Sequence, residues 1–272
     1  MDKEFIKTNV TPWENVEIAR HKDRPTGKYY IDIIFKDFIE FHGDRAFGDD
    51  KSIIGGIASF NDINVTVIAI TKGSNTTENI ERNFGMPNPE GYRKALRLMK
   101  QAEKFKRPII CFVDTPGAFP GIGAEERGQG QAIANNLFEL SRLRTPIISI
   151  VTGEGGSGGA LALAIADKIF MLEHSVYSIL TPEGFASILW KDASRTKEAA
   201  EVMKITAKNL KDFNIIDDVI KEPRGGAHKN PAKTAEGIKK SIVDSLAELR
   251  GKDLDVLIKE RYDKFRQMGN FY

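Results

Sequence analysis

Five glycines fall within residues 152–159, which read Thr-Gly-Glu-Gly-Gly-Ser-Gly-Gly and are followed by Ala160. Glycine at this density weakens the interior of a helix or a strand, so we expect the segment to act through its exposed backbone. At a turn from a strand into a helix, its N–H groups would be free to donate to a negatively charged oxygen. The glycine segment (residues 152–160) therefore indicates an anion site, although close packing of a helix on a strand would also use small residues.

A second turn follows the predicted strand 108–113. Residues 114–121, here called the proline turn, read Asp-Thr-Pro-Gly-Ala-Phe-Pro-Gly. The carboxyl ends of parallel strands lie at one edge of a sheet, where ligands collect and helix N-termini present free amides. Two such turns on neighbouring strands could direct two backbone donors at one oxygen. This arrangement is an oxyanion hole, and it requires no particular side chain.

Two other patterns overlap the same glycines. Gly153-x-Gly155-x-x-Gly158 matches the dinucleotide-binding fingerprint, with Glu173 as the acid that would bind a ribose. This pattern arises easily by chance in a glycine-rich stretch. A phosphate-binding loop of the Walker type is excluded because no Lys-Ser or Lys-Thr pair follows the glycines.

The second pattern is Gly-x-Ser-x-Gly, which residues 155–159 match with Ser157 as the nucleophile of a hydrolase. Downstream acids, Asp192 or Asp217, and then His228 occur in the chain order that such enzymes use. Ser157 lies six residues beyond Val151, the predicted end of its strand, whereas a nucleophile elbow places the serine at the strand end. A serine hydrolase therefore stays as an alternative function.

The elements that must position the two turns alternate between strands and helices, which is typical of parallel βαβ units with right-handed crossovers. A hairpin around Asn61-Asp62 is expected to precede them. The expected strands are 53–60, 65–71, 108–113, 146–151, 168–172 and 177–180, and the expected helices are 30–41, 92–102, 125–143, 156–166, 196–210, 231–249 and 254–268. We expect residues 1–29 to form an N-terminal arm and residues 30–272 to form one domain that includes the C-terminal helices.

The composition bears on several classes of protein. Lys and Arg number 40 against 38 Asp and Glu, so the net charge of +2 gives no reason to expect a nucleic acid or a membrane surface as partner. Cys111 is the single cysteine, which excludes an internal disulfide and a cysteine-based zinc site in this chain. Its apolar neighbours predict a buried structural residue. No signal peptide or membrane-spanning stretch is recognised, so we expect a cytoplasmic protein.

A series of short motifs extends over nearly the whole chain. They are Gly43-Asp44-Arg45, Ile54-Gly55-Gly56-Ile57-Ala58, Arg82-Asn83-Phe84-Gly85-Met86-Pro87, Pro89-Glu90-Gly91-Tyr92-Arg93-Lys94-Ala95, Asp114-Thr115-Pro116-Gly117-Ala118, Gly123-Ala124-Glu125-Glu126-Arg127-Gly128-Gln129, Gly153 to Leu163, Pro182-Glu183-Gly184 and Pro223-Arg224-Gly225-Gly226-Ala227-His228. In this order they resemble the α subunit of the bacterial acetyl-CoA carboxylase carboxyltransferase. Longer members of that family carry an N-terminal helical extension, and this chain begins near the point where the extension ends.

The resemblance implies a crotonase-like (ClpP/crotonase) α/β fold, a spiral of ββα units with a C-terminal helical extension. It implies transfer of a carboxyl group from carboxybiotin, on a biotin carboxyl carrier protein, to acetyl-CoA, which gives malonyl-CoA for fatty acid biosynthesis. It also implies a partner β subunit, which carries a zinc ribbon and most of the acyl-CoA side, in an assembly expected to be α2β2. Zinc is expected on that subunit, and this chain is expected to bind no metal.

The resemblance also implies roles for the two turns. Backbone amides of Gly158, Gly159 and Ala160 are expected to bind the biotin oxygen, with Gly117 and Ala118 as their complement. A side chain added at Gly158 is expected to crowd these donors. The residues expected to contact substrate are Gly155, Gly156, Ser157, Phe119, Pro120 and Lys72, the last as a candidate for CoA phosphates. Under this reading Ser157 is a bystander, and the roles of Arg127 and His228 stay open.

Overall fold

A computed structural model describes residues 10–269, and within them eight strands form one sheet. Their order is β1-β2-β3-β4-β5-β6-β8, and β7 pairs with the end of β5. The strands are β1 (Lys36–Glu40), β2 (Ile53–Phe60), β3 (Ile63–Ile70), β4 (Ile109–Thr115), β5 (Ile147–Gly156), β6 (Lys168–Leu172), β7 (Val176–Ser178) and β8 (Asp218–Ile220). From β3 to β8 neighbouring strands are parallel, which confirms the expected βαβ organisation.

Helices cover both faces of this sheet. They are α1 (Pro12–Ala19), α2 (Gly27–Ile34), α3 (Thr76–Glu81), α4 (Pro89–Lys104), α5 (Ile122–Glu126), α6 (Gln129–Leu140), α7 (Ser157–Ala164), α8 (Pro182–Phe185), α9 (Thr196–Met203), α10 (Ala207–Asp212), α11 (Pro231–Leu249) and α12 (Leu254–Gln267). Short helical turns complete the list: η1 (Asn83–Gly85), η2 (Ala186–Trp190), η3 (Ala193–Arg195) and η4 (Ala227–Lys229). None of these helices combines the length and the apolar character that crossing a bilayer requires.

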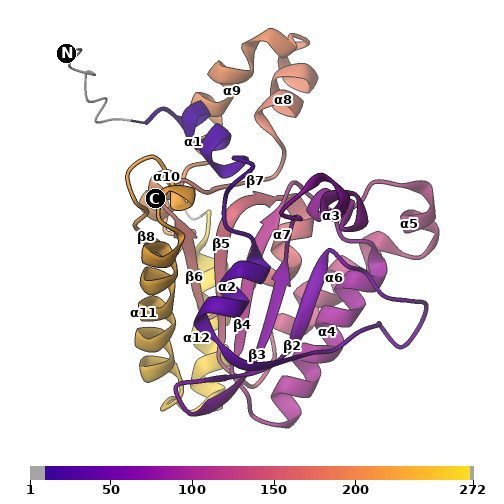
Figure 1. Cartoon of the computed structure of the whole chain (residues 1–272), viewed down its shortest axis with the longest axis vertical. Helices are drawn as coiled ribbons and strands as arrows, with labels where there is room; N and C mark the ends of the chain where they lie inside the picture. The colour runs from indigo at the N-terminus through magenta and orange to yellow at the C-terminus, as the bar shows by residue number, and fades with distance from the viewer. Residues whose placement is uncertain (1–9, 270–272) are drawn as a thin grey trace.

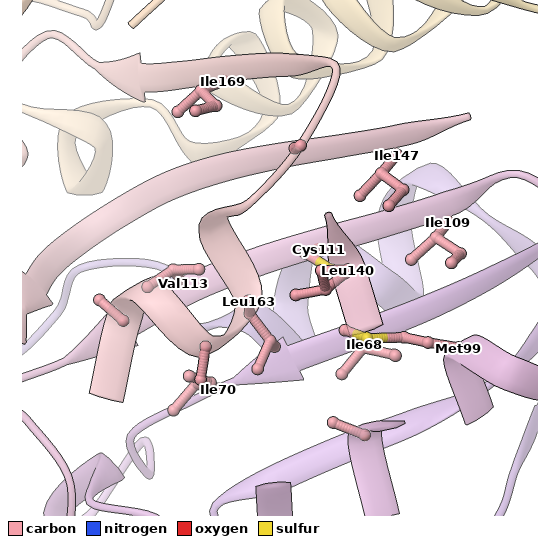
Figure 2. Close-up of a cluster of buried hydrophobic side chains, with 14 of the residues drawn as sticks. Ile68, Ile70, Met99, Ile109, Cys111, Val113, Leu140, Ile147, Leu163 and Ile169 are labelled. Carbon is pink, nitrogen blue, oxygen red and sulfur yellow. The ribbon is translucent and has the colours of Figure 1, made fainter. Parts of the chain in front are cut away.

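Two hydrophobic cores lie on opposite faces of the sheet. One core packs α4, α6 and α7 against the strands, and the other packs α2 and α11 against them. Figure 1 shows this layering, with α2, α11 and α12 on one side and α4 and α6 on the other. Figure 2 shows Cys111 inside the first core, beside Leu140, and burial raises the pKa of its thiol. Cys111 is therefore a buried core residue, as expected.

Local signals explain several elements that the sequence predicts correctly. Asn61 and Asp62 both adopt left-handed backbone angles, with φ of 45° and 62°, which suits the two-residue turn between β2 and β3. Pro231 opens α11, and the side chain of Asn230 accepts a hydrogen bond from the amide of Lys233. The predicted hairpin and the predicted helix 231–249 are thus confirmed.

Three predicted helices are wrong in extent. The helix expected over 30–41 ends at Ile34, and β1 follows it because the chain turns extended at Phe35 to pair with β2. The helix expected over 125–143 is interrupted at Gly128, whose φ of 83° ends α5 and starts α6. The helix expected over 196–210 is divided at Lys204, whose φ is 55°. Apolar spacing continues across each break, so periodicity alone does not locate it.

The end of β5 departs most from the prediction, and it positions the site. The predicted strand 146–151 continues to Gly156. Its first part pairs with β6 at 148–151, and its last part pairs with β7 at 154–156. Between these parts the register against β4 shifts, since Val113 is opposite Val151 but Thr115 is opposite Gly155. The glycine segment is therefore a bulged strand end that leads directly into α7.

The N-terminal segment is folded against the rest of the chain. Residues 1–9 of the expected arm lie outside the described residues, and the remainder contains α1 and the start of α2. Helix α1 contacts α9 and β5, and Figure 1 shows α1, α8 and α9 together at one end of the molecule. The division into an arm over 1–29 and a domain over 30–272 stays a prediction.

Candidate active site

The glycine segment changes from strand to helix at Ser157. Gly153 and Gly155 lie within β5, and Ser157 is the first residue of α7 with a left-handed φ of 51°. A dinucleotide fingerprint needs its first glycines in the strand-to-helix turn, so the pattern 153–158 does not form one here. Glu173, the suggested ribose ligand, instead pairs with Lys221 at 2.8 Å.

The two predicted turns are in direct contact. A Cβ atom added to Gly156 would overlap the carbonyl oxygen of Pro116, and one added to Gly159 would lie 2.5 Å from the backbone nitrogen of Ala118. At Gly158 the nearest atom would be 3.5 Å away, an ordinary contact with Ile133. The close approach therefore explains the glycines at 156 and 159, and crowding by a new Cβ is severe at Gly159 rather than at Gly158.

Several amides at this contact lack an acceptor within secondary structure. In a helix that begins at Ser157, the amides of Ser157, Gly158 and Gly159 precede the first intrahelical hydrogen bond, and Ala160 is the first to have a helical acceptor. On the proline turn, Gly117 donates to the Thr115 hydroxyl at 3.0 Å. The amide of Ala118 donates to no atom of residues 10–269. The free donors are thus the amides of Ser157, Gly158 and Gly159 at the start of α7, together with the amide of Ala118.

The start of α7 faces a largely apolar cavity of about 320 Å³. Its walls are Leu161, Tyr177, Ile179, Leu210 and Ile215, together with Ser157, Gly158 and Ser178. Gly155 and Gly156 line a neighbouring small cleft, and Phe119 and Pro120 line neither. A ligand in this cavity would rest its apolar part on these walls and meet the positive end of the α7 dipole.

An ionic cluster of Lys72, Asp114 and Glu154 joins the two turns. The ammonium of Lys72 lies 3.0 Å from a carboxylate oxygen of Asp114 and 2.7 Å from one of Glu154. The same Asp114 oxygen accepts a hydrogen bond from the Glu154 amide at 2.9 Å. Asp114 is the first residue of the proline turn and Glu154 belongs to the glycine segment, so the cluster fixes one turn against the other.

Charge pairing decides the protonation states in this cluster. Burial would raise the pKa of Glu154, but Lys72 and Arg20 lower it below its ordinary value. Burial would also lower the pKa of Lys72, but Asp114 and Glu154 raise it. Lys72 therefore carries its charge between two carboxylates, and contact with a CoA phosphate would require it to exchange these partners.

Arginines from the N-terminal segment reach the same strand end. Arg20 donates to Glu154 at 2.6 Å, and Arg24 donates to the carbonyl oxygen of Thr152 at 2.6 Å. Arg24 also forms a two-pronged pair with the buried Glu222. Residue spacing gave no indication of these roles, because Arg20 and Glu154 are 134 positions apart.

Comparison with known proteins identifies the family. The sequence matches the family described as acetyl co-enzyme A carboxylase carboxyltransferase-like over residues 2–269. The chain belongs to this family. It is 82% identical to the acetyl-coenzyme A carboxylase carboxyl transferase subunit alpha of Clostridium beijerinckii over all of both chains. It is 59% identical to the corresponding subunit of a Geobacillus species, over 98% of this chain and 82% of that one. The chain is thus a transferase subunit of acetyl-CoA carboxylase.

Solved structures with low sequence identity share the fold. Transcarboxylase 12S matches with a TM-score of 0.70 and 20% identity, over 90% of this chain and 45% of that chain. A malonate decarboxylase MdcD-MdcE heterodimer from Pseudomonas matches with a TM-score of 0.62 and 18% identity, over 79% and 89% of the two chains. These likenesses confirm the crotonase-like fold that the sequence motifs implied.

The acetyl-CoA carboxylase family assignment agrees with the surroundings of Ser157. Because β5 extends to Gly156, Ser157 does lie directly at the strand end, and the expectation that it lies too far along the chain was wrong. The cavity beside it, however, has no histidine or carboxylate among its described lining residues. His174 bonds to Asn15 at 2.8 Å and His228 stacks on His21, with 3.8 Å between ring centres. The hydrolase alternative is therefore not supported.

In this carboxyltransferase subunit, residues 10–269 contain no group of three histidine, cysteine or acidic side chains arranged to hold a metal ion.

Arg127, whose role the sequence left open, donates to Glu90 at 2.6 Å and lies over the ring of Phe47 at 4.7 Å. It therefore stabilises the loop around Phe47 and the start of α4.

Proposed function

We propose that this chain supplies the carboxybiotin side of a carboxyltransferase site that it shares with a β subunit. The carboxyl group comes from carboxybiotin, a substrate carried by a biotin carboxyl carrier protein, and passes to acetyl-CoA to give malonyl-CoA for fatty acid biosynthesis. We place this reaction in the cytoplasm. The contact between the glycine segment and the proline turn, with the Ala118 amide beside Gly159, is the observation that carries the proposal.

The amides at this contact have a defined task in such a reaction. When the carboxyl group leaves the ureido nitrogen, negative charge develops on the ureido oxygen, and fixed N–H donors stabilise that charge without reorganising. Gly158 and Gly159 of α7, with Ala118 opposite, are the donors that we propose. Gly117 supports the turn through Thr115. Each such donor is worth about 3–4 kcal/mol in the transition state.

A proton must also leave the methyl group of acetyl-CoA. Asp114 of the proline turn and Glu154 of the glycine segment are both held by Lys72. Since Lys72 and Arg20 lower the pKa of Glu154, it is a weak base. We propose that the ureido group of the carrier-bound substrate accepts this proton once its carboxyl group has left.

The cavity suits the substrate that we propose. Biotin has an apolar ring and hydrocarbon chain with a polar ureido group, which matches an apolar cavity beside free helix amides. The acyl-CoA side, with a zinc ribbon, is assigned to the β subunit, and the assembly is proposed to be α2β2. The proposed substrate contacts also include Phe119, Pro120 and Lys72. Ala160 was expected as a third donor, but it is the first residue of α7 with a helical acceptor, so its amide is not among the donors that we propose.

Reconstitution tests this function directly. The chain is mixed with the β subunit and a carboxybiotinylated carrier, and malonyl-CoA is measured by chromatography. We expect transfer with both proteins present, none with the chain alone, and unchanged transfer for Ser157→Ala. No malonyl-CoA from the complete mixture would overturn the proposal, and loss of transfer only in Ser157→Ala would restore a nucleophilic serine.

A further inference from the structure

We infer that Arg20 is a positioning residue of this site, because one guanidinium holds both the glycine segment and the helix that follows the cavity wall. The inference rests on the proposed function. Nε of Arg20 lies 2.6 Å from Glu154 in β5, and its Nη1 lies 2.6 Å from Glu183 in α8. Arg20 itself comes from the end of α1.

The Glu154 end of this link reaches the amides. Glu154 is a buried residue that stands between Gly153 and Gly155 in the sequence, and its own amide donates to Asp114. Arg20 lines the same cleft as Glu154 and Gly156, the residue that precedes α7. A shift of the Arg20 guanidinium would therefore move the strand end from which the free amides of α7 extend.

The Glu183 end reaches the cavity wall. Tyr177, Ser178 and Ile179 line the cavity, and four residues after Ile179 the chain arrives at Glu183 in the first turn of α8. Residues 182–203, here called the projection, comprise α8, η2, η3 and α9 and pack on α1 at one end of the molecule (Figure 1). Arg20 thus ties the projection, and with it one wall of the cavity, to the glycine segment.

The chemistry of the link requires an arginine. A guanidinium offers a planar fork of donors and can bind two carboxylates at once, whereas an ammonium acts as a point charge. Burial would lower the pKa of Arg20, but Glu183 and Glu154 raise it. Glu154 has Lys72 as a second partner. Across residues 10–269, Glu183 has Arg20 as its one ion-pair partner. Loss of Arg20 therefore releases the projection more than it releases the strand.

Steady-state kinetics of the α–β complex test the inference, with the biotinylated carrier as the varied substrate. For Glu183→Gln we expect KM for the carrier to rise about tenfold or more, the effect of one lost charged hydrogen bond, with kcat within about twofold of wild type. Arg20→Lys should raise KM as Glu183→Gln does, because a lysine ammonium can pair with only one of the two carboxylates, Glu154 or Glu183. Arg20→Gln should raise KM and also lower kcat.

Two comparisons separate positioning from a general loss of stability. The double variant Arg20→Gln/Glu183→Gln should have the KM of Arg20→Gln alone, since both changes break one link. Glu198→Gln breaks the exposed pair with Arg195 on the same projection and should change neither parameter. Additive increases in KM, or equal effects of Glu183→Gln and Glu198→Gln, would overturn the inference.

Hydrogen exchange on the full chain provides a readout that does not depend on activity. Glu183→Gln and Arg20→Gln should increase amide exchange over residues 182–190, whereas Glu198→Gln should not. Unchanged exchange in both variants would contradict the link even if the complex were active. Conversely, increased exchange with an inactive wild-type complex would uphold the link and refute the proposed function, so the two failures are distinguishable.

Discussion

The contact between the two turns depends on individual glycines. Gly156 and Gly159 have no room for a Cβ atom because the proline turn lies against them. Ser157 lies between them with a left-handed φ, so the chain accepts local strain to change from strand to helix in one residue. The amides that result are rigid because the two turns and the Lys72 cluster hold their backbone on both sides.

Gly159→Ala should therefore inactivate the site. The new methyl group would meet the nitrogen of Ala118 at 2.5 Å and the hydroxyl of Tyr92 at 2.9 Å, which separates the turns. We expect kcat for carboxyl transfer to fall about 100-fold or more, the effect of losing one fixed donor. The matched control is Gly130→Ala in α6, where a Cβ atom meets nothing within 4 Å. Equal activity of the two variants would contradict the assignment.

Asp44 makes a second residue-scale prediction, on stability. Burial would raise its pKa, but the amides of Ala46, Phe47 and Gly48 and the guanidinium of Arg93 lower it from 3.8 to about 2. A lowered folded-state pKa contributes stability above the unfolded pKa, and this contribution is lost as the pH falls through the folded pKa. Asp44 therefore contributes roughly 2 kcal/mol at neutral pH, which disappears between about pH 4 and pH 2.

Urea unfolding of wild type and Asp44→Asn at several pH values checks this prediction. The difference in the free energy of unfolding should be largest near neutral pH and should shrink towards pH 2. A difference that stays constant over this range would show that the ionised carboxylate is not the source of the stability.

At the scale of elements, one buried arginine attaches the C-terminal helix to the sheet. Arg261 of α12 is 1% exposed, and its side chain makes five hydrogen bonds. Two of them join the carboxylate of Asp167, which precedes β6, and the other three join backbone carbonyl oxygens before β5. This pair fixes α12 together with Leu254, Leu257 and Phe265, which pack on the two cores, while much of the rest of the helix is charged and exposed.

Arg261→Met should destabilise the fold by about 3–5 kcal/mol, since it leaves the buried charge of Asp167 without its guanidinium. Urea unfolding measures the loss. Lys259→Ala on the same helix removes only an exposed pair with Asp263 and should change stability by less than about 0.5 kcal/mol. If both variants unfold at the same urea concentration, α12 is not held by this pair.

At the scale of the whole molecule, the site is proposed to be completed by a second protein. The described chain offers one cavity beside the free amides but no second set of donors that we assign to acyl-CoA. We expect the chain and the β subunit to assemble as α2β2, which sedimentation velocity would show as a single species of the corresponding mass. An αβ species that is fully active would contradict this stoichiometry.

Local signals in the chain were sufficient to predict much of this protein. The β2–β3 hairpin, the βαβ order, α11 and the importance of the glycine segment all follow from turn residues, caps and apolar spacing, which act within a few positions. The family motifs identified the carboxyltransferase fold and activity. The hairpin and α11 are encoded locally because residues close in the chain make their hydrogen bonds.

The tertiary structure alone decided where β5 ends, because its last residues are strand through pairing with β7 and, across the register shift, with β4. It also decided that Lys72 lies between Asp114 and Glu154, and that Arg20 reaches across 134 positions to the glycine segment. Such contacts form between residues far apart in the chain, so no spacing rule anticipates them. The turns are thus local features, whereas their relative placement depends on charges that only folding brings together.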